Sequence, residues 1–409
     1  MEKTKKYVIV LSVLVLAVIL LFTVRTVWQG EKLVDEPKTE DVTKEIESSG
    51  DIVGDKIGVT LSLFQSSFKE NENTLISPLS VEAAMAMAAN GAAGDTLLEM
   101  EGLFGKTEKQ NQYFQAFFSD EQLKSANSLW IKEETGSGNI DLKDDFVDKI
   151  SSCYKAEIFE KAFDESTLDE INQWISEKTD GYVQQGMDAI DEYAVLYLMN
   201  TIVFEAEWEE KFNKQITEKS IFYASDDKQY EMDFMYSMEH TFIGDDKSSG
   251  VIKAYEGGRF SFAAILPNEE IKLKDYVVQL KREEFLNLIQ KQSRVNLEIE
   301  LPKWKQESRI KLKDVLKEMG IKDLFDEQKA DLSHITQTYP LFVNDIVHKT
   351  FMEIDEDGTK AGAATIVGID RLTAKMPEKH IKFDRPFLFC ILDNETNLPI
   401  FMGAFVSPE

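Results

Sequence analysis

Histidine and cysteine are scarce in this chain of 409 residues, which has four of the first and two of the second. The two cysteines, Cys153 and Cys390, are too few for a disulfide framework. The sequence has no H-E-x-x-H helix, G-x-S-x-G elbow, P-loop or C-x-x-C pair. We therefore expect no catalytic residue, metal site or cofactor. A hydrolase with scattered catalytic residues is the remaining enzyme interpretation, and no motif supports it.

Basic residues are also in the minority, with 46 Lys and Arg against 74 Asp and Glu, so the formal net charge is −28. Phosphate binding needs clustered Lys and Arg, so this balance argues against a nucleic-acid partner. The acidity keeps the protein soluble, and a sharper interpretation is that it favours basic target proteins. A chain of this length can bury a large core without disulfides or metals.

The N-terminus carries the one long apolar run. Lys3, Lys5 and Lys6 precede an uncharged stretch of 18 residues, 7–24, and Trp28 follows it. This length is at the lower limit for a membrane span, and no small-x-small cleavage site follows. We expect an uncleaved anchor within residues 1–28, with the rest of the chain outside the cell; a cleaved secretory signal is the alternative. No cysteine follows the run, so a lipoprotein anchor is not expected.

Beyond this leader, residues 29–51 are acidic and polar, which is typical of a flexible tether. The main body, 52–409, has neither a low-complexity tract nor an internal repeat. Its apolar patterns predict strands at 125–132, 193–204, 260–266 and 295–301, and helices at 144–150 and 310–319. Helices early in the chain and strands later predict an α+β fold.

An unusual segment, FMEIDEDGTKAGAATIVGIDR, lies at 351–371. Gly358 lacks a Cβ and can take φ values that other residues avoid. Small residues alternate after it with Thr, Val and Ile, a composition that suits neither a surface loop nor a permanent helix. Strand faces alternate, so one face would be entirely small or apolar while Lys360 would lie on the other. That face comprises Thr359, Ala361, Ala363, Thr365, Val367 and Ile369. The segment is therefore predicted to enter a sheet as an extra strand.

The whole stretch 347–365, VHKTFMEIDEDGTKAGAAT, resembles the reactive-loop hinge of the serpins. Four further stretches are similar to family motifs in the expected order: TLISPLSVEAAMAMAANGAAGDT (74–96), LYLMNTIVFEAEWEEKF (196–212), LPKWK (301–305) and ADLSHI (330–335). The C-terminal stretch from 381 also looks like the end of a serpin. The resemblance covers residue 52 to the end. It implies one serpin domain, with a large main sheet, further sheets, surrounding helices and a mobile loop near 356–380.

The resemblance also implies roles for particular residues. Ser77, Ser80, Asn200 and His348 match the shutter, a polar cluster beneath the main sheet where the strands part. Trp208, Lys303 and Glu356 match the breach, where the loop first enters the sheet. The matching hinge residues are Glu356, Gly358, Thr359, Ala361 and Ala363. Lys360 departs from the acidic residue common at its position.

The bond cut by a target protease lies, in this family, a fixed distance after the hinge glycine. Counting from Gly358 places it at Leu372–Thr373. Arg371–Leu372 is the alternative if the loop is used one residue short. Counting back from Phe383 gives a position near Lys375 instead, because the loop is slightly longer on that side.

What the resemblance implies for function is inhibition of serine proteases by a suicide substrate. A protease would attack the loop, form an acyl-enzyme and be trapped when the loop inserts into the sheet. We expect a monomer from a prokaryote, on the outer side of the membrane or secreted. A chymotrypsin- or subtilisin-like target is favoured by a leucine at the cut bond. The alternative is a non-inhibitory carrier or chaperone, which the small hinge residues argue against.

Overall fold

The structure is a computed structural model that describes residues 50–118, 124–133, 140–183, 185–191, 194–337, 340–343, 346–359 and 376–408. Contacts divide the chain into Met1–Asp51 and Ile52–Glu409. No helix of the described ranges is long and apolar enough to cross a membrane. The apolar run at 7–24 lies outside these ranges, as does nearly all of the predicted tether.

The first helices precede most of the strands in the chain. They are α3 (Gly50–Ser67), α4 (Pro78–Gly91), α5 (Gly94–Phe104), α6 (Thr107–Phe117), α7 (Asp144–Tyr154) and α8 (Glu165–Lys178). Of these, α4, α5, α6 and α7 pack around one another. α4 is buried along its whole length, and its alanines and methionines permit close packing on every side. Ser77 caps its N-terminus, and Pro78 occupies the first turn, where its missing N–H costs nothing.

Three short helices and two 3₁₀ turns follow in the second half. They are α9 (Leu273–Gln279), α10 (Arg282–Gln290), α11 (Leu312–Glu318), η1 (Lys214–Ile216) and η2 (Asp323–Phe325). The helix predicted at 310–319 is shorter than expected, because Ile310 and Lys311 still pair with His348 and Val347 as the end of a strand. Gly320 follows it at a φ of +107°, which glycine tolerates and other residues resist.

Nine strands of the described residues form the largest sheet, in the order β1-β16-β15-β9-β8-β7-β10-β14, with β6 on β7. Their bounds are β1 (Thr74–Ile76), β6 (Glu218–Tyr223), β7 (Gln229–Gly244), β8 (Ser248–Ala254), β9 (Phe260–Pro267), β10 (Ser293–Pro302), β14 (Lys379–Lys382), β15 (Phe387–Asp393) and β16 (Leu398–Phe405). β9, β15 and β16 are buried throughout, as expected of strands covered on both faces.

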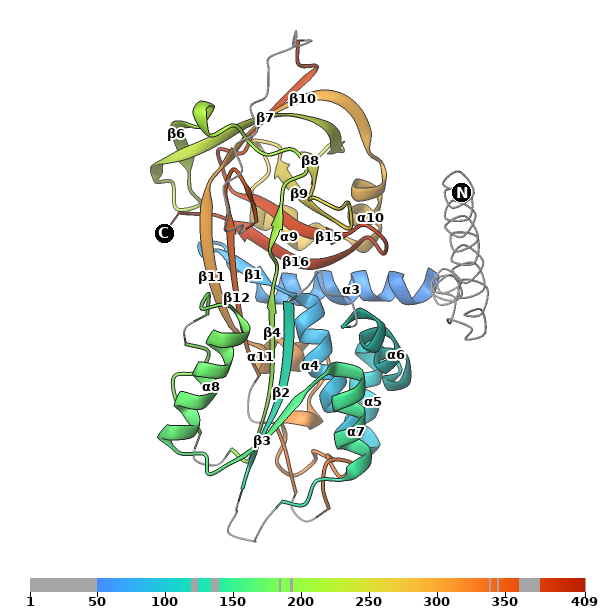
Figure 1. The fold of residues 1–409 in the computed structure, drawn as a ribbon. Coiled ribbons are helices and arrows are strands. Elements are labelled where there is room, and N and C mark those ends of the chain that lie inside the picture. The colour runs from blue at the N-terminus through green and yellow to red at the C-terminus, as the bar shows by residue number, and fades with distance from the viewer. Residues whose placement is uncertain are drawn as a thin grey trace, which may run out of the picture. The chain divides into compact units, whose positions relative to one another are not determined.

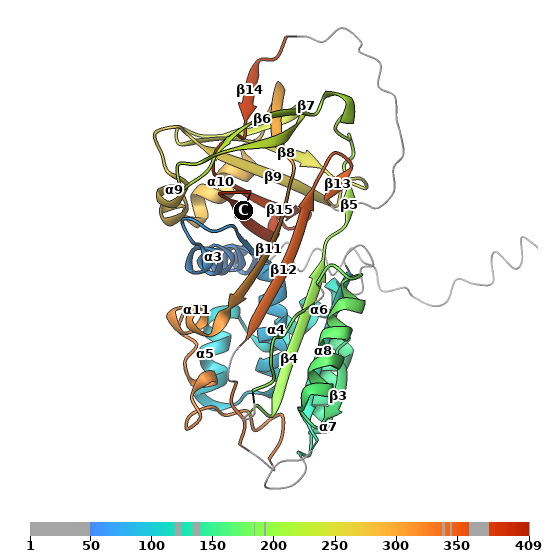
Figure 2. The ribbon, with the colours of Figure 1, turned by 90° about the vertical axis from the view of Figure 1, so that its left-hand side faces the viewer.

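Two smaller ladders complete the fold. One has the order β3-β2-β4 and the other β11-β12-β13-β5. Their strands are β2 (Lys124–Lys132), β3 (Glu157–Lys161), β4 (Leu196–Val203), β5 (Ala206–Glu207), β11 (Trp304–Lys311), β12 (Val347–Ile354) and β13 (Gly358–Thr359). Figures 1 and 2 show β4 and β12 side by side, so the two ladders together make one interrupted sheet.

Helices cover both faces of this interrupted sheet. α4 packs on one face of β4, where Leu196, Leu198 and Ile202 join the main core. α8 packs on the other face, where Tyr197 and Met199 join a second, smaller cluster around Trp130 and Trp174. Even-numbered residues of β4 therefore face α4, and odd-numbered ones face α8. The α+β class expected from the sequence is confirmed.

Candidate functional site

The central feature of the site is a break between β4 and β12. No ladder joins these two strands anywhere in the described part of the sheet, although they are neighbours (Figure 2). Their extensions are joined only at one end, where β13 pairs antiparallel with both β12 and β5. Below this join, cavities lie on both faces: one beneath α8, lined from Tyr197 to Ile202, and one lined by Ala84 and Ala88 of α4.

Polar groups at the start of α4 hold the two sides of the break. On the β12 side, His348 is buried, and the backbone N–H of Ser77 donates to its Nε2 at 2.9 Å. The hydroxyl of Ser77 donates to the carbonyl of Ile400 at 2.8 Å. This places the predicted residues His348 and Ser77 in one cluster under the sheet.

On the β4 side, the hydroxyl of Ser80 donates to Oδ1 of Asn200. The amide of Asn200 donates in turn to Oδ1 of Asn127 on β2 at 2.6 Å, and Asn127 donates to the carbonyl of Tyr154. Ser77 and Ser80 lie one turn apart at the start of α4, where the Ser80 N–H donates to the Ser77 hydroxyl. The helix start therefore ties both strands without bonding them to each other.

Burial decides the charge of His348. It lowers the pKa of this imidazole from 6.5 to about 4, because the charged form loses its hydration. His348 is therefore neutral at pH 7, which agrees with its Nε2 accepting a hydrogen bond from a backbone N–H. Protonation would place a proton against that N–H.

The hinge begins inside the sheet. In β13, Gly358 pairs with Glu207, and Thr359 pairs with Ala206 and Ile354. A Cβ on Gly358 would lie 2.1 Å from the carbonyl oxygen of Ala206, so close approach of two backbones, and not an unusual φ, explains the glycine. Thr359 is 1% exposed.

Tyr255 receives the side chain of Thr359. The two hydroxyls share a hydrogen bond, and the Tyr255 ring stacks on Trp208 with centroids 4.5 Å apart. Burial raises the pKa of the Tyr255 hydroxyl, so it stays protonated and keeps a proton for this bond. The first residue of the strand-like segment therefore has a satisfied, buried position.

Trp208 also binds the acidic turn that precedes the hinge. Its backbone N–H donates to the carbonyl of Asp357, and its indole N–H donates to the carbonyl of Asp355, both at 2.9 Å. The carboxylate of Asp355 accepts from the N–H groups of Asp357 and Gly358. The backbone and the indole of Trp208 therefore both bind carbonyl groups of this turn and fix its position.

Glu356 points inward from this turn. Its carboxylate lies 2.8 Å from Nζ of Lys303, accepts from the Thr217 hydroxyl at 2.9 Å and is 6% exposed. Burial alone raises its pKa, but the hydrogen bonds from Lys303 and Thr217 lower it overall. A second pair, Lys214 with Asp357 at 2.5 Å, lies beside it. The turn therefore carries two ion pairs that hold the top of the break.

The structure brings together the residues that the sequence assigns to the shutter, and likewise those assigned to the breach. The remaining assigned residues lie outside the described ranges: Ala361, Ala363, Arg371, Leu372, Thr373 and Lys375. Sequence reasoning missed Tyr255, Asn127, Thr217 and Lys214. Asn127 lies within the strand predicted at 125–132, but nothing in a lone Asn reveals its partner across the sheet. No group of His, Cys, Asp or Glu suited to a metal occurs in the part of the chain described.

Comparisons with known proteins agree with one another. A family model described as "Serpin (serine protease inhibitor)" matches residues 56–408. The leukocyte elastase inhibitor of Homo sapiens is 30% identical over 359 residues, covering 82% of this chain and 93% of that protein. Tengpin, a thermophilic serpin, matches in its native state with a TM-score of 0.82 at 37% identity, covering 88% of this chain and 95% of that one. Its latent state matches with a TM-score of 0.78 at 36% identity, covering 88% and 99%.

Proposed function

The chain belongs to the serpin family and has its fold, and we propose that it traps serine proteases as a suicide substrate. Members of this family are described as inhibitors of serine proteases, and the similar human protein is named as an elastase inhibitor. The finer steps, namely cleavage of the loop, capture of the acyl-enzyme and insertion of the loop, are proposed here for this chain. The non-inhibitory carrier is the alternative within the same fold.

The observation that supports this mechanism is the double pairing of β13. It runs antiparallel to both β12 and β5, with Thr359 opposite Ile354 and Ala206. A strand that continues from Thr359 meets one earlier residue on each side at every step. Residue 365, six positions on, would therefore lie between His348 and Asn200, six positions back. The continuing strand would fill the break between β4 and β12.

The alternation of side chains along the strand also supports insertion into the break. Thr359 faces the core, so residues 361, 363, 365, 367 and 369 of an inserted strand would face the core as well. All of them are small or apolar. Lys360 would face α8 and solvent, where a charge costs little. Thr365 would bring a hydroxyl between His348 and Asn200, the two polar side chains on either edge of the break.

Insertion would convert a cut into a trap. The target's serine attacks the carbonyl of Leu372, and the amine of Thr373 leaves with the C-terminal part of the chain. The new end remains esterified to the protease and is drawn along the sheet as the strand inserts. Deacylation needs an intact oxyanion hole in the protease, and distortion of that site would slow it. Serpin loop insertion of this kind releases strain stored in the intact fold.

A denaturing gel tests the proposal. An active chymotrypsin- or subtilisin-like protease mixed with the full-length chain should give an adduct that survives SDS. A catalytically dead protease with its serine replaced should give none. Complete turnover of the chain by the active protease, without any adduct, would favour the non-inhibitory alternative.

We propose in addition that residues 7–24 hold the domain at the outer face of a membrane. The support is the basic start, the 18 apolar residues and the missing cleavage site. Cell fractionation should recover the chain with the membrane, accessible to protease added outside. Soluble protein that begins between about residues 25 and 35 would indicate a cleaved signal instead.

A further inference from the structure

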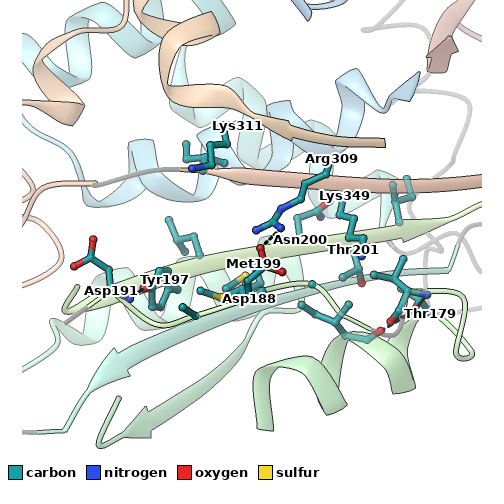
Figure 3. Close-up of a pocket in the computed structure, with 18 residues that line it drawn as sticks. Thr179, Asp188, Asp191, Tyr197, Met199, Asn200, Thr201, Arg309, Lys311 and Lys349 are labelled. Atoms are coloured by element: carbon teal, nitrogen blue, oxygen red, sulfur yellow. Dashed lines mark hydrogen bonds and ion pairs between the residues drawn. The ribbon is translucent and has the colours of Figure 1, made fainter. Parts of the chain in front are cut away.

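A cavity of about 220 Å³ lies between α8 and the break in the sheet. α8 and the segment after it supply Ile175, Val183 and Met187. β4 supplies the side chains of Tyr197, Met199 and Thr201, which face α8 (Figure 3). At about 30 Å³ for each water in the liquid, this space equals roughly seven waters. It is large enough for a small organic molecule and too small for a folded partner.

One polar group faces this cavity without a partner. The hydroxyl of Thr201 is buried and finds no hydrogen bond among the described residues, and the residue is 9% exposed. A buried hydroxyl without a partner is costly, and native structures usually satisfy it with a protein group, a water or a ligand. Thr201 therefore marks a position where a bound polar atom would stabilise the site.

Cations line the opposite side. Lys349 of β12 and Arg309 of β11 are direct partners across their ladder, and both side chains reach toward β4 (Figure 3). Nζ of Lys349 donates to the carbonyl of Gln185 and lies 2.6 Å from the carboxylate of Glu307. These two contacts occupy two of the three protons of the Lys349 ammonium. The third proton can serve a ligand. The Lys349 side chain is 17% exposed, so a bond formed there is partly shielded from water.

The free donors of the lining set the class of ligand. The charges around the cavity balance, because three cations, Arg309, Lys311 and Lys349, meet three carboxylates, Asp188, Asp191 and Glu307. The donors that remain are one ammonium proton of Lys349 and the Thr201 hydroxyl. Two donors match the two oxygens of a single carboxylate better than a phosphate dianion, and the apolar wall formed by α8 matches a short hydrocarbon or aromatic tail.

We propose that this cavity binds a small aryl or alkyl monocarboxylate, with its oxygens between the Thr201 hydroxyl and the Lys349 ammonium. Thr359 pairs with Ile354 on one side and Ala206 on the other. Lys349 and Thr201 each lie five residues before these partners, so a strand that continues from β13 would bring position 364 opposite both. A bound carboxylate would lie where an inserted strand passes. Resting on the proposed function, occupancy of the cavity would oppose loop insertion and turn the inhibitor into a substrate.

Calorimetry of the full-length chain with hydrocinnamate and with heptanoate tests binding and separates the aromatic from the alkyl tail. Lys349→Met removes a charged donor to the carboxylate and should weaken binding at least about tenfold. Thr201→Val removes a neutral donor and should weaken it about fivefold. Thr201→Val removes an unsatisfied hydroxyl, so it should fold at least as well as the parent. Lys305→Met is the matched control, because Lys305 lies on the neighbouring strand β11 opposite Glu353, near the other end of the same ladder.

The uncharged hydrocinnamamide should bind at least tenfold more weakly than the acid. Saturating hydrocinnamate should lower the yield of SDS-stable adduct and raise the yield of cleaved chain, while leaving the protease's activity on a small substrate unchanged. Absence of saturable binding, equal binding by the amide, or equal affinity in the Lys349→Met and Lys305→Met variants would overturn the site. Binding without any change in adduct yield would overturn only the proposal that the ligand opposes loop insertion. If the chain never forms adducts, the proposed inhibitory function is wrong, and the calorimetry still decides whether the cavity binds a carboxylate.

Discussion

At the scale of single residues, the proposed inhibition depends on which side chains enter the sheet. Thr359 already does so, in a buried position with a hydrogen bond to Tyr255. Its neighbour Lys360 begins the stretch outside the described ranges and would face solvent in an inserted strand. In an inserted strand, a charged side chain would therefore be tolerated at every second position, beginning with Lys360, and would be costly at the positions between.

Thr359→Arg should therefore convert the inhibitor into a substrate. A guanidinium at this position would have to be buried against Tyr255 and Trp208 without a carboxylate, at a cost of several kcal/mol. The stoichiometry of inhibition, measured by titrating a protease, should rise severalfold. Thr359→Val, which keeps the shape and loses only the hydroxyl, is the matched control and should still form adducts. Unchanged stoichiometry in the arginine variant would refute entry of the hinge into the sheet.

Leu372 sets the specificity we expect. A leucine at the cut bond suits the apolar pocket of chymotrypsin-like and subtilisin-like enzymes, whereas trypsin-like pockets bind a cation. Leu372→Arg should move inhibition toward trypsin-like enzymes, and Arg371→Ala should leave chymotrypsin-like trapping largely intact. Mass spectrometry of the released C-terminal fragment identifies the bond directly. A fragment that begins at Leu372 would mean that Arg371–Leu372 is cut instead.

His348 should make stability depend on pH. Its pKa is about 4 in the fold and 6.5 as a free group, so the unfolded chain binds more protons between these values. The free energy of unfolding is then highest above pH 6.5 and falls as the pH drops toward 4. From pH 7.5 to 5.5 the loss from this group is about 1.3 kcal/mol. Denaturant unfolding at both pH values should show this loss in the parent and not in His348→Asn. The control is His334→Asn, which replaces an exposed histidine and should show the same loss as the parent.

At the scale of elements, the two-residue strand β13 closes the sheet at one end. Gly358→Ala should break it, because the added Cβ would lie 2.1 Å from a backbone oxygen that cannot move cheaply. We expect a loss of roughly 2–3 kcal/mol and faster hydrogen exchange of the amides in β5. Gly102→Ala is the control: nothing lies near that Cβ, and alanine favours a helix by about 1 kcal/mol. Equal effects of the two changes would contradict this view of β13.

The elements differ in how far the sequence could predict them. Strands with alternating or continuous apolar patterns, such as β9 and β10, were predicted within one or two residues. The helix predicted at 310–319 was wrong at its start, because local pattern cannot show that Ile310 pairs with His348 across a ladder. Serpin motifs identified Ser77 and His348, whereas Tyr255 had no motif to mark it. Its role depends on the stacking with Trp208 and on contact with Thr359, which only the folded chain creates.

At the scale of the whole molecule, the intact fold leaves its sheet incomplete. β4 and β12 are neighbours, with polar clusters on both edges and cavities on both faces. The similarity to native tengpin exceeds that to latent tengpin, with TM-scores of 0.82 and 0.78. If the inserted state has the lower free energy, as we propose, a high barrier to insertion would let this state persist.

In the proposed mechanism, residues after Thr359 enter the break once the loop is cut. The most direct measurement is the melting temperature of the full-length chain before and after one cut near Leu372, in the same buffer. Ten added strand residues paired on both sides should raise it by roughly 10 °C or more. Thr365→Arg, cut at the same bond, should show a much smaller rise, because the proposed insertion would bury a guanidinium between His348 and Asn200. A cut parent that melts at the same temperature as the intact chain would contradict the account.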